Sequence, residues 1–287
     1  MLATRDGKMA DGRVVHAADM SSAMAIEKLL DEACPDLIIN TAAYTAVDRA
    51  ETDEQLATQV NGDALSAIGH WAASRQALVM HYSTDYVFDG TKRAPYTVND
   101  TPAPINAYGR SKLAGEHALR ATGAPHFIFR TAWVYSAHGN NFFRSMLRLA
   151  GQREQLRVVN DQFGSPTTTG LITKASLAAI ERWRQSAGVQ TSELLGTYHL
   201  VSSGLTTWHD FASAIFQRAT AAGLLSTAPR VIAIGAKDYP TPASRPAWSV
   251  LDNTSFSQSF RFPLPDWQAG LDDVINELYV EANGLSC

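Results

Sequence analysis

The chain has 287 residues with a formal net charge of −4, and 45% of its residues are hydrophobic. These values indicate a globular protein large enough for two domains, and they give no reason to expect a nucleic-acid partner or an anionic membrane surface. The two cysteines form no disulfide or metal-binding pattern, and neither a signal peptide nor a membrane-spanning apolar run is present, so we expect a cytoplasmic protein without a metal site.

Strands and helices are predicted to alternate through the first half of the chain. The predicted strands cover residues 2–4, 14–16, 37–39, 78–81 and 127–130. The first predicted helix is capped by Ser21 or Ser22 and ends before Pro35, and further helices cover residues 51–59, 63–75 and 108–121. This alternation is typical of an α/β fold with a Rossmann-like, doubly wound parallel sheet, which we assign to residues 1–150.

The second half of the chain is less regular. Strands are predicted at residues 156–159, 198–201 and 231–234, and helices at residues 141–150, 169–184, 208–222 and 266–279. We expect a smaller substrate-binding domain over residues 151–287, with segments that return to the sheet.

The amino-terminal part departs from the usual start of a dinucleotide-binding sheet, which is a strand, a glycine-rich loop and a helix. The sequence contains neither GxGxxG nor GxxGxxG, and its first strand resembles the second strand of such a unit. We therefore expect that the first strand, loop and helix are missing, and that the native product is about thirty residues longer. The alternative is a short protein with a repaired sheet and no dinucleotide site. In the first case, residues 2–4 and 37–40 would flank a gap in the sheet.

Polar residues follow the strand at 78–81 directly, where open α/β sheets bind their ligands. Thr84 and Asp85 lie there, and Tyr108 and Lys112 follow at the start of a predicted helix. Residues four apart share one helix face, and an ammonium beside a phenol lowers the pKa of the phenol. Each pattern alone is common on helix surfaces and in turns. Their order and spacing favour a catalytic site made of Thr84, Tyr108 and Lys112, which could transfer a proton near neutral pH.

The chain resembles the extended short-chain dehydrogenase/reductases and, among them, the dTDP-4-dehydrorhamnose reductase family. The resemblance extends from about residue 2 to residue 278 and rests on motifs in a fixed order. They are NTAAYTAVDRAE (40–51), HYSTDYVFDG (81–90), NAYGRSKLAGE (106–116), FRTAWVY (129–135), NDQFGSPT (160–167) and TPASRP (241–246).

This resemblance implies that NADPH or NADH reduces the 4-keto group of dTDP-4-dehydro-L-rhamnose, which supplies rhamnose for surface polysaccharide such as lipopolysaccharide. Tyr108 would donate a proton to the new alkoxide, Lys112 would hold the nicotinamide ribose, and Thr84 would orient the reacting oxygen. The resemblance also allows a bound Mg²⁺ and a homodimer.

Further residues match positions near the cofactor or the substrate in this family. The cofactor candidates are Arg5, Asp19, Ala42, Ala43 and Tyr44, of which Arg5 would favour the 2′-phosphate of NADP. The substrate candidates are Asp85, Trp133 and Arg245, whose guanidinium suits a diphosphate. Each has a plainer explanation as well: a surface arginine, a helix cap, a strand-to-helix turn or a core tryptophan.

Two other functions remain open at this stage. One is a nucleotide-sugar epimerase or dehydratase, although dehydratases usually carry an acidic pair after the strand-end threonine, and here Tyr86 follows Asp85. The other is a non-catalytic relative, or an inactive truncated one, that serves as a regulatory or binding subunit.

Overall fold

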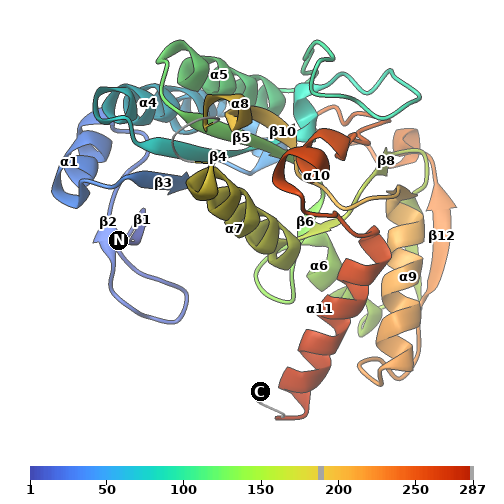
Figure 1. The fold of residues 1–287 in the computed structure, drawn as a ribbon. Helices are drawn as coiled ribbons and strands as arrows, with labels where there is room; N and C mark the ends of the chain where they lie inside the picture. Colours follow the sequence, from blue (N-terminus) through green and yellow to red (C-terminus); the bar gives the residue numbers. More distant parts are fainter. Residues whose placement is uncertain (187–190, 285–287) are drawn as a thin grey trace.

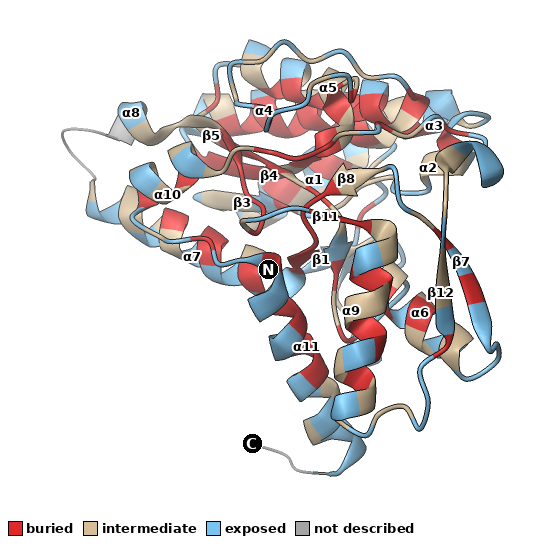
Figure 2. Cartoon of the chain, turned by 90° about the vertical axis from the view of Figure 1, so that its right-hand side faces the viewer, coloured by how far each residue is buried: buried red, intermediate tan, exposed pale blue. Residues whose placement is uncertain are grey.

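A four-stranded parallel sheet forms the centre of the protein, and the computed structural model describes residues 1–186 and 191–284 (Figure 1). Its strands are hydrogen-bonded in the order β10-β5-β4-β3. These strands are β3 (Leu37–Asn40), β4 (Leu78–Thr84), β5 (His126–Thr131) and β10 (Gly196–His199). Because β4 and β5 are the inner strands, they are apolar and buried on both faces, as Figure 2 shows.

Helices cover both faces of this sheet. On one face the packed helices are α1 (Ala23–Ala33), α4 (Ala64–Arg75) and α5 (Ala107–Ala121). The shorter elements α2 (Val47–Ala50), α3 (Glu54–Thr58) and the π-helical turn η1 (Gln59–Asp63) lie beside α5. The other face is covered by α7 (Thr169–Gln185) and α10 (Thr254–Phe260), and α8 (Thr191–Leu194) leads into β10. This arrangement confirms the Rossmann-like α/β fold.

A second apolar core lies away from the central sheet and includes residues of α9 and α11, two helices that Figure 1 shows side by side. It is built from α6 (Phe142–Ala150), β7 (Gln155–Val159), α9 (Trp208–Ala221), β12 (Arg230–Ile234) and α11 (Trp267–Ala282). Two short ladders connect it to the rest: β6 (Val134–Tyr135) with β9 (Thr167–Thr168), and β8 (Phe163–Gly164) with β11 (Thr206–Thr207). Two short helical turns, η2 (Asp85–Val87) and η3 (Ala236–Asp238), follow β4 and β12 respectively.

The predicted elements agree closely with those observed. α7 and β10 come after residue 150 yet pack on or pair within the central sheet, as expected for segments that return to it. The division into domains at residue 150 stays a prediction.

The amino-terminal residues form a separate small ladder. β1 (Ala3–Thr4) pairs in parallel with β2 (His16–Ala17), while β3 pairs with β4 and ends the strand order of the central sheet. Residues 2–4 and 37–40 therefore lie in different sheets. The expected loss of a strand, a glycine-rich loop and a helix stays a prediction. Ile39 of β3 is 48% exposed, which is unusual for an apolar residue of a doubly wound sheet.

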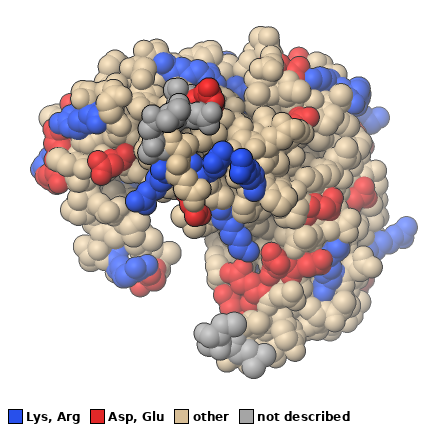
Figure 3. Space-filling model, viewed as in Figure 1, with Lys and Arg blue, Asp and Glu red and all other residues tan. Residues whose placement is uncertain are grey.

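The surface carries charges of both signs. Basic and acidic side chains are interspersed over the face shown in Figure 3, with acidic groups gathered near the grey carboxyl-terminal residues. Among the described residues, no helix combines the length and apolar character that crossing a membrane requires.

We predict that Phe129→Ala destabilises the protein by about 3–5 kcal/mol, because it removes a fully buried ring that contacts several other aromatic rings. The measurement is the free energy of unfolding in urea. Leu177→Ala is the control, since Leu177 is 60% exposed on α7. Equal effects of the two substitutions would contradict the assignment of this core.

Candidate active site

The site begins where β4 ends. Thr84 accepts a hydrogen bond from the backbone N–H of Tyr86 at 3.2 Å, which caps the turn η2. Its hydroxyl also donates to Asp85 at 3.0 Å. Both Thr84 and Asp85 are buried, so their orientation is set by the strand end and by these two contacts.

Tyr108 approaches this strand end from the first turn of α5. The helix is capped by Asn106, whose side chain accepts from the N–H of Gly109 at 2.7 Å. A Cβ at Gly109 would collide with the backbone carbonyl of Tyr86, so glycine allows α5 to lie against η2. The phenol of Tyr108 thereby comes close enough to the hydroxyl of Thr84 for that hydroxyl to lower the pKa of the phenol.

Lys112 lies one turn further along α5 and is 1% exposed. Its Nζ donates to the backbone carbonyl of Tyr82 at 2.7 Å and lies 3.1 Å from Nε2 of His81. Burial lowers the pKa of Lys112 to about 8, and the charge of Glu116 opposes this effect. Thr84, Tyr108 and Lys112 therefore come together at the carboxyl end of β4.

The electrostatics of Tyr108 differ from the sequence-based expectation that Lys112 lowers the pKa of the phenol. Burial raises the pKa of Tyr108 to about 12, and the hydrogen bond to Thr84 only partly offsets it. The physical reason is that the ammonium of Lys112 is directed at β4, while the phenol has lost most of its hydration. Tyr108 is consequently a protonated phenol at neutral pH.

A buried ion pair fixes α5 against the sheet. Glu116 accepts from Arg130 of β5 at 2.9 and 2.7 Å and from Ser83 of β4 at 2.6 Å. Burial alone would raise the pKa of Glu116, but the contacts with Arg130 and Ser83 outweigh it and lower the pKa to about 2. Since Glu116 is one turn beyond Lys112, this contact sets the position of both catalytic candidates on the helix.

Asp85, a substrate candidate, is a buried carboxyl. Burial raises its pKa to about 6, partly offset by hydrogen bonds with Ser249 and Thr84. Among the described residues, its Oδ2 atom has no hydrogen-bond partner. A buried polar atom of this kind next to Thr84 is suited to a hydroxyl of a bound ligand.

Trp133, another substrate candidate, has a left-handed backbone with φ of +47°, a conformation that costs a bulky residue energy. Its ring stacks on that of Trp208, with centroids 3.4 Å apart and an angle of 5° between the planes. A Cβ at Gly164 would collide with the Trp133 ring. Trp208 in turn lines the large cavity of the protein.

This cavity, of about 960 Å³, lies between α6, β7 and the segment 236–245. Arg245 lines it and donates to the carboxylate of Asp48 at 2.9 and 3.0 Å, and to the backbone carbonyl of Ala243 at 2.9 Å. The guanidinium is thus held at the cavity wall by a carboxylate from α2. Its use for a diphosphate stays a prediction.

The cofactor candidates occupy two places. Ala42, Ala43 and Tyr44 follow β3, and Ala42 donates its N–H to Asn40 at 3.1 Å. The phenol of Tyr44 donates to Asp53 at 3.1 Å, and its backbone N–H donates to Asn61 at 2.9 Å.

Arg5 and Asp19 lie together at the ends of β1 and β2. Both are exposed. Asp19 accepts from the N–H and hydroxyl of Ser21 at 2.9 and 2.8 Å, which stabilises the turn before α1, whereas Ser22 caps the helix itself. The cofactor roles of these five residues stay predictions.

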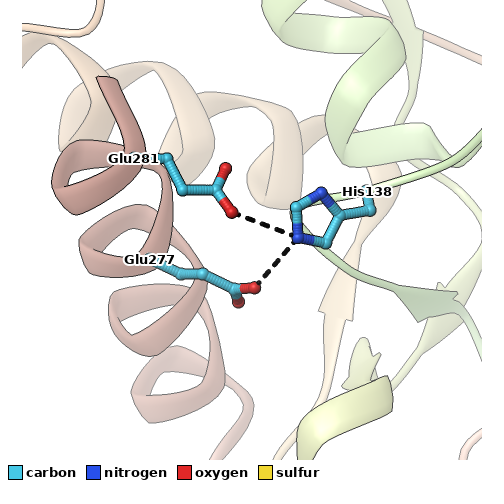
Figure 4. Close-up of side chains that lie close together, drawn as sticks. All are labelled: His138, Glu277 and Glu281. Atoms are coloured by element: carbon cyan, nitrogen blue, oxygen red, sulfur yellow. Dashed lines mark ion pairs between the residues drawn. The ribbon is translucent and has the colours of Figure 1, made fainter. Parts of the chain in front are cut away.

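One further cluster carries potential metal ligands. His138 lies 3.3 Å from Glu277 and 3.2 Å from Glu281, which are one turn apart on α11 (Figure 4). All three side chains are exposed, and opposite charges account for the arrangement when the imidazole is protonated. Nothing in the comparisons with known proteins supports the Mg²⁺ that the resemblance allowed.

Comparison with known proteins agrees with the fold. The parallel sheet, with Thr84 and Tyr108 at the carboxyl end of β4, defines the class as Rossmann-like α/β proteins of the short-chain reductase type. The family model described as "RmlD substrate binding domain" matches residues 2–280. The dTDP-4-dehydrorhamnose reductase of Shigella flexneri is 44% identical over 92% of this chain and 87% of its own length. This chain belongs to the dTDP-4-dehydrorhamnose reductase family.

Two solved structures support the same relationship. The dTDP-4-dehydrorhamnose reductase of Clostridium acetobutylicum superposes with a TM-score of 0.81 at 33% identity, covering 91% of this chain and 87% of that one. The Bacillus anthracis enzyme, in complex with NADP, gives a TM-score of 0.80 at 32% identity with the same coverage.

Several residues of the site were not found from the sequence. Asp48, Trp208 and His81 contact predicted site residues, yet each lies in a different motif or element from its partner. Of these three residues, only His81 could have been identified from the sequence, because it lies at the polar end of a buried strand.

We predict that Glu116→Gln destabilises the protein by about 3–5 kcal/mol at pH 7, because Arg130 would keep a buried charge without its carboxylate partner. The depressed pKa of Glu116 stabilises the fold above its ordinary value of 4.5, and this contribution is lost as pH falls toward about 2. The stability difference between wild type and variant, measured by thermal unfolding, should therefore shrink over that range. Glu27→Gln, at an exposed position of α1, is the control. If the stability difference between wild type and Glu116→Gln did not depend on pH, the ionisation of Glu116 would not contribute to stability as proposed.

Proposed function

We propose that this chain is an NAD(P)H-dependent reductase that converts dTDP-4-dehydro-L-rhamnose to dTDP-L-rhamnose in rhamnose biosynthesis. The observation that carries the proposal is that Thr84 at the end of β4 lies beside the phenol of Tyr108, with Lys112 buried one turn away on α5. Membership of the dTDP-4-dehydrorhamnose reductase family supports this reaction over the epimerase and regulatory-subunit alternatives.

Tyr108 is the proton donor of the proposed reaction. With a pKa of about 12 the phenol is protonated at neutral pH, as a donor to an alkoxide must be. When bound, the nicotinamide cofactor supplies a hydride to the carbonyl carbon, and the carbonyl oxygen takes the proton of Tyr108. The resulting phenolate regains a proton from solvent, so that the reduction consumes one hydride and one proton.

Thr84 and Lys112 assist this transfer. The hydroxyl of Thr84 is fixed by Asp85 and by the cap of η2, so it can orient the reacting oxygen beside the phenol. Lys112 is an ammonium below a pKa of about 8, and its proposed role is to hold the nicotinamide ribose one helical turn from Tyr108.

The residues present suit a nicotinamide cofactor. Lys112 and Tyr108 would hold the nicotinamide ribose, and the small side chains of Ala42 and Ala43 leave the backbone after β3 accessible to a ligand. NADP is bound in the Bacillus anthracis relative, which supports the choice of cofactor. Arg5 favours NADP over NAD through a 2′-phosphate.

The dTDP group is proposed to occupy the cavity of about 960 Å³ lined by Arg245 and Trp208. Its volume suits a nucleotide sugar, and the fork of the guanidinium suits a diphosphate. Asp85 and Trp133 would contact the sugar between this cavity and Thr84. A homodimer in the cytoplasm remains the working hypothesis for the assembly.

We predict that Tyr108→Phe lowers turnover by about 10²–10⁴-fold, because the proton donor is lost while the ring is kept. The assay follows NADPH consumption with dTDP-4-dehydro-L-rhamnose and identifies the sugar product. Tyr82→Phe is the control, because the hydroxyl of Tyr82 bonds to Ser176 on the opposite side of the sheet. Near-normal turnover of Tyr108→Phe would exclude the donor role, and an inactive wild type would exclude the proposed function.

A second prediction concerns Arg245→Gln, which should raise the KM for the dTDP-sugar by about 10–100-fold with a smaller change in kcat, because a charged contact with the diphosphate is lost. Steady-state kinetics with varied sugar nucleotide measure this. The control is Arg230→Ala, an exposed arginine of β12. An unchanged KM would place the diphosphate elsewhere.

A further inference from the structure

A buried histidine contacts the proposed catalytic lysine from the neighbouring strand. His81 is 0% exposed, and its Nε2 lies 3.1 Å from Nζ of Lys112. Together with the carbonyl of Tyr82 at 2.7 Å, this contact directs two of the three N–H bonds of the ammonium at β4. The lysine is therefore positioned from two sides of one strand end.

The other side of the imidazole contacts Asn40 of β3. Asn40 and His81 are directly paired in the register of the sheet, and Nδ1 of His81 lies 3.2 Å from the side-chain amide nitrogen of Asn40. The amide oxygen of Asn40 accepts the N–H of Ala42 at 3.1 Å. A continuous chain of contacts thus leads from Lys112 to the loop proposed to lie beside the cofactor.

The protons on Lys112 determine which tautomer the imidazole of His81 can adopt. An ammonium can only donate, so Nε2 of His81 must accept from it and the ring proton must reside on Nδ1. For Nδ1–H to find an acceptor, the amide of Asn40 must exchange its nitrogen and its oxygen, which releases the N–H of Ala42. Burial, followed by the charge of Lys112, holds the pKa of His81 well below its usual range, so the ring is neutral.

We propose that His81 is a positioning residue, which holds Lys112 in its ammonium form through Nε2 while Asn40 keeps the ring proton on Nδ1. This inference rests on the proposed function of Lys112, and it assigns no direct contact with substrate to His81.

A second buried histidine of the same sheet provides a comparison. His199 of β10 is 0% exposed, and its Nδ1 lies 3.1 Å from the backbone carbonyl of Asp252. Within the described part of the chain, its Nε2 has no hydrogen-bond partner. A histidine buried in this sheet therefore need not contact a side chain through each ring nitrogen. The two side-chain contacts of His81, to Lys112 and Asn40, are a specific feature of the site.

The first test uses the unmodified protein. Nitrogen-15 NMR of its histidine side chains at pH 7, with His81 assigned by the His81→Gln variant, reports which ring nitrogen carries the proton. We expect a neutral His81 with its proton on Nδ1. A proton on Nε2, or a charged ring, would overturn the proposal whether or not the protein shows activity.

The second test compares two amide substitutions that differ by one methylene group. In His81→Gln the side-chain oxygen can reach the place of Nε2, whereas in His81→Asn it is too short to reach Lys112. Glu116 and Tyr108 on α5 are the other titratable groups near Lys112, and both variants keep them. In His81→Asn, Lys112 loses the acceptor that Nε2 of His81 provides, and this loss should lower the pKa of Lys112 further.

We expect the alkaline limb of the kcat/KM profile, where Lys112 loses its proton, to move down by about one pH unit in His81→Asn, a tenfold change in proton affinity. His81→Gln should restore the wild-type limb. The control is His199→Asn, which changes a buried histidine without touching Lys112 and should leave the limb in place. Identical limbs in wild type, His81→Asn and His81→Gln would overturn the inference.

The outcomes separate this inference from the proposed function. An inactive wild type would contradict the reductase assignment, while the NMR result would still decide the tautomer. Suppose that the wild type is active, Tyr108→Phe is inactive and His81→Asn has no effect. The proposed reductase function would then stand, and the proposed role of His81 would be wrong. Thermal unfolding of each variant identifies any loss of fold; if His81→Asn does not fold, the NMR result decides.

Discussion

The geometry of the site depends on the buried ion pair between Glu116 of α5 and Arg130 of β5. Glu116 also accepts from Ser83 of β4, so one carboxylate joins the helix to both inner strands of the sheet. Buried charges are costly unless fully paired, which makes this contact intolerant of sliding or rotation of α5. Tyr108 and Lys112 are on the same helix, within two turns of Glu116, and are therefore placed against the end of β4 by the same constraint.

Burial has opposite consequences for the two catalytic candidates. It keeps the phenol of Tyr108 protonated, with a pKa of about 12, and makes the ammonium of Lys112 easier to deprotonate, with a pKa of about 8. At neutral pH the phenol therefore keeps its proton and Lys112 keeps its positive charge. The hydrogen bonds of Lys112 to β4 then matter, since they favour the charged form that burial disfavours.

The sequence predicted much of this arrangement. Alternating apolar segments located the central strands and helices, and the spacing of Tyr108 and Lys112 placed both on one face of α5, as the structure shows. The expected effect of Lys112 on the pKa of Tyr108 was wrong, because spacing along a helix does not report how far each group is removed from water. The partners Asp48 and His81 were missed for a related reason, since their contacts join segments far apart in the chain.

The sequence by itself determined the α/β class, the order of the elements and the identity of the groups that can transfer a proton, because these follow from local periodicity and residue chemistry. Only the tertiary structure decided which charges are buried, which carboxylate holds Arg245 and which histidine supports Lys112. These properties depend on distances between strands and helices that are not neighbours in sequence, and on the exclusion of water when they pack together.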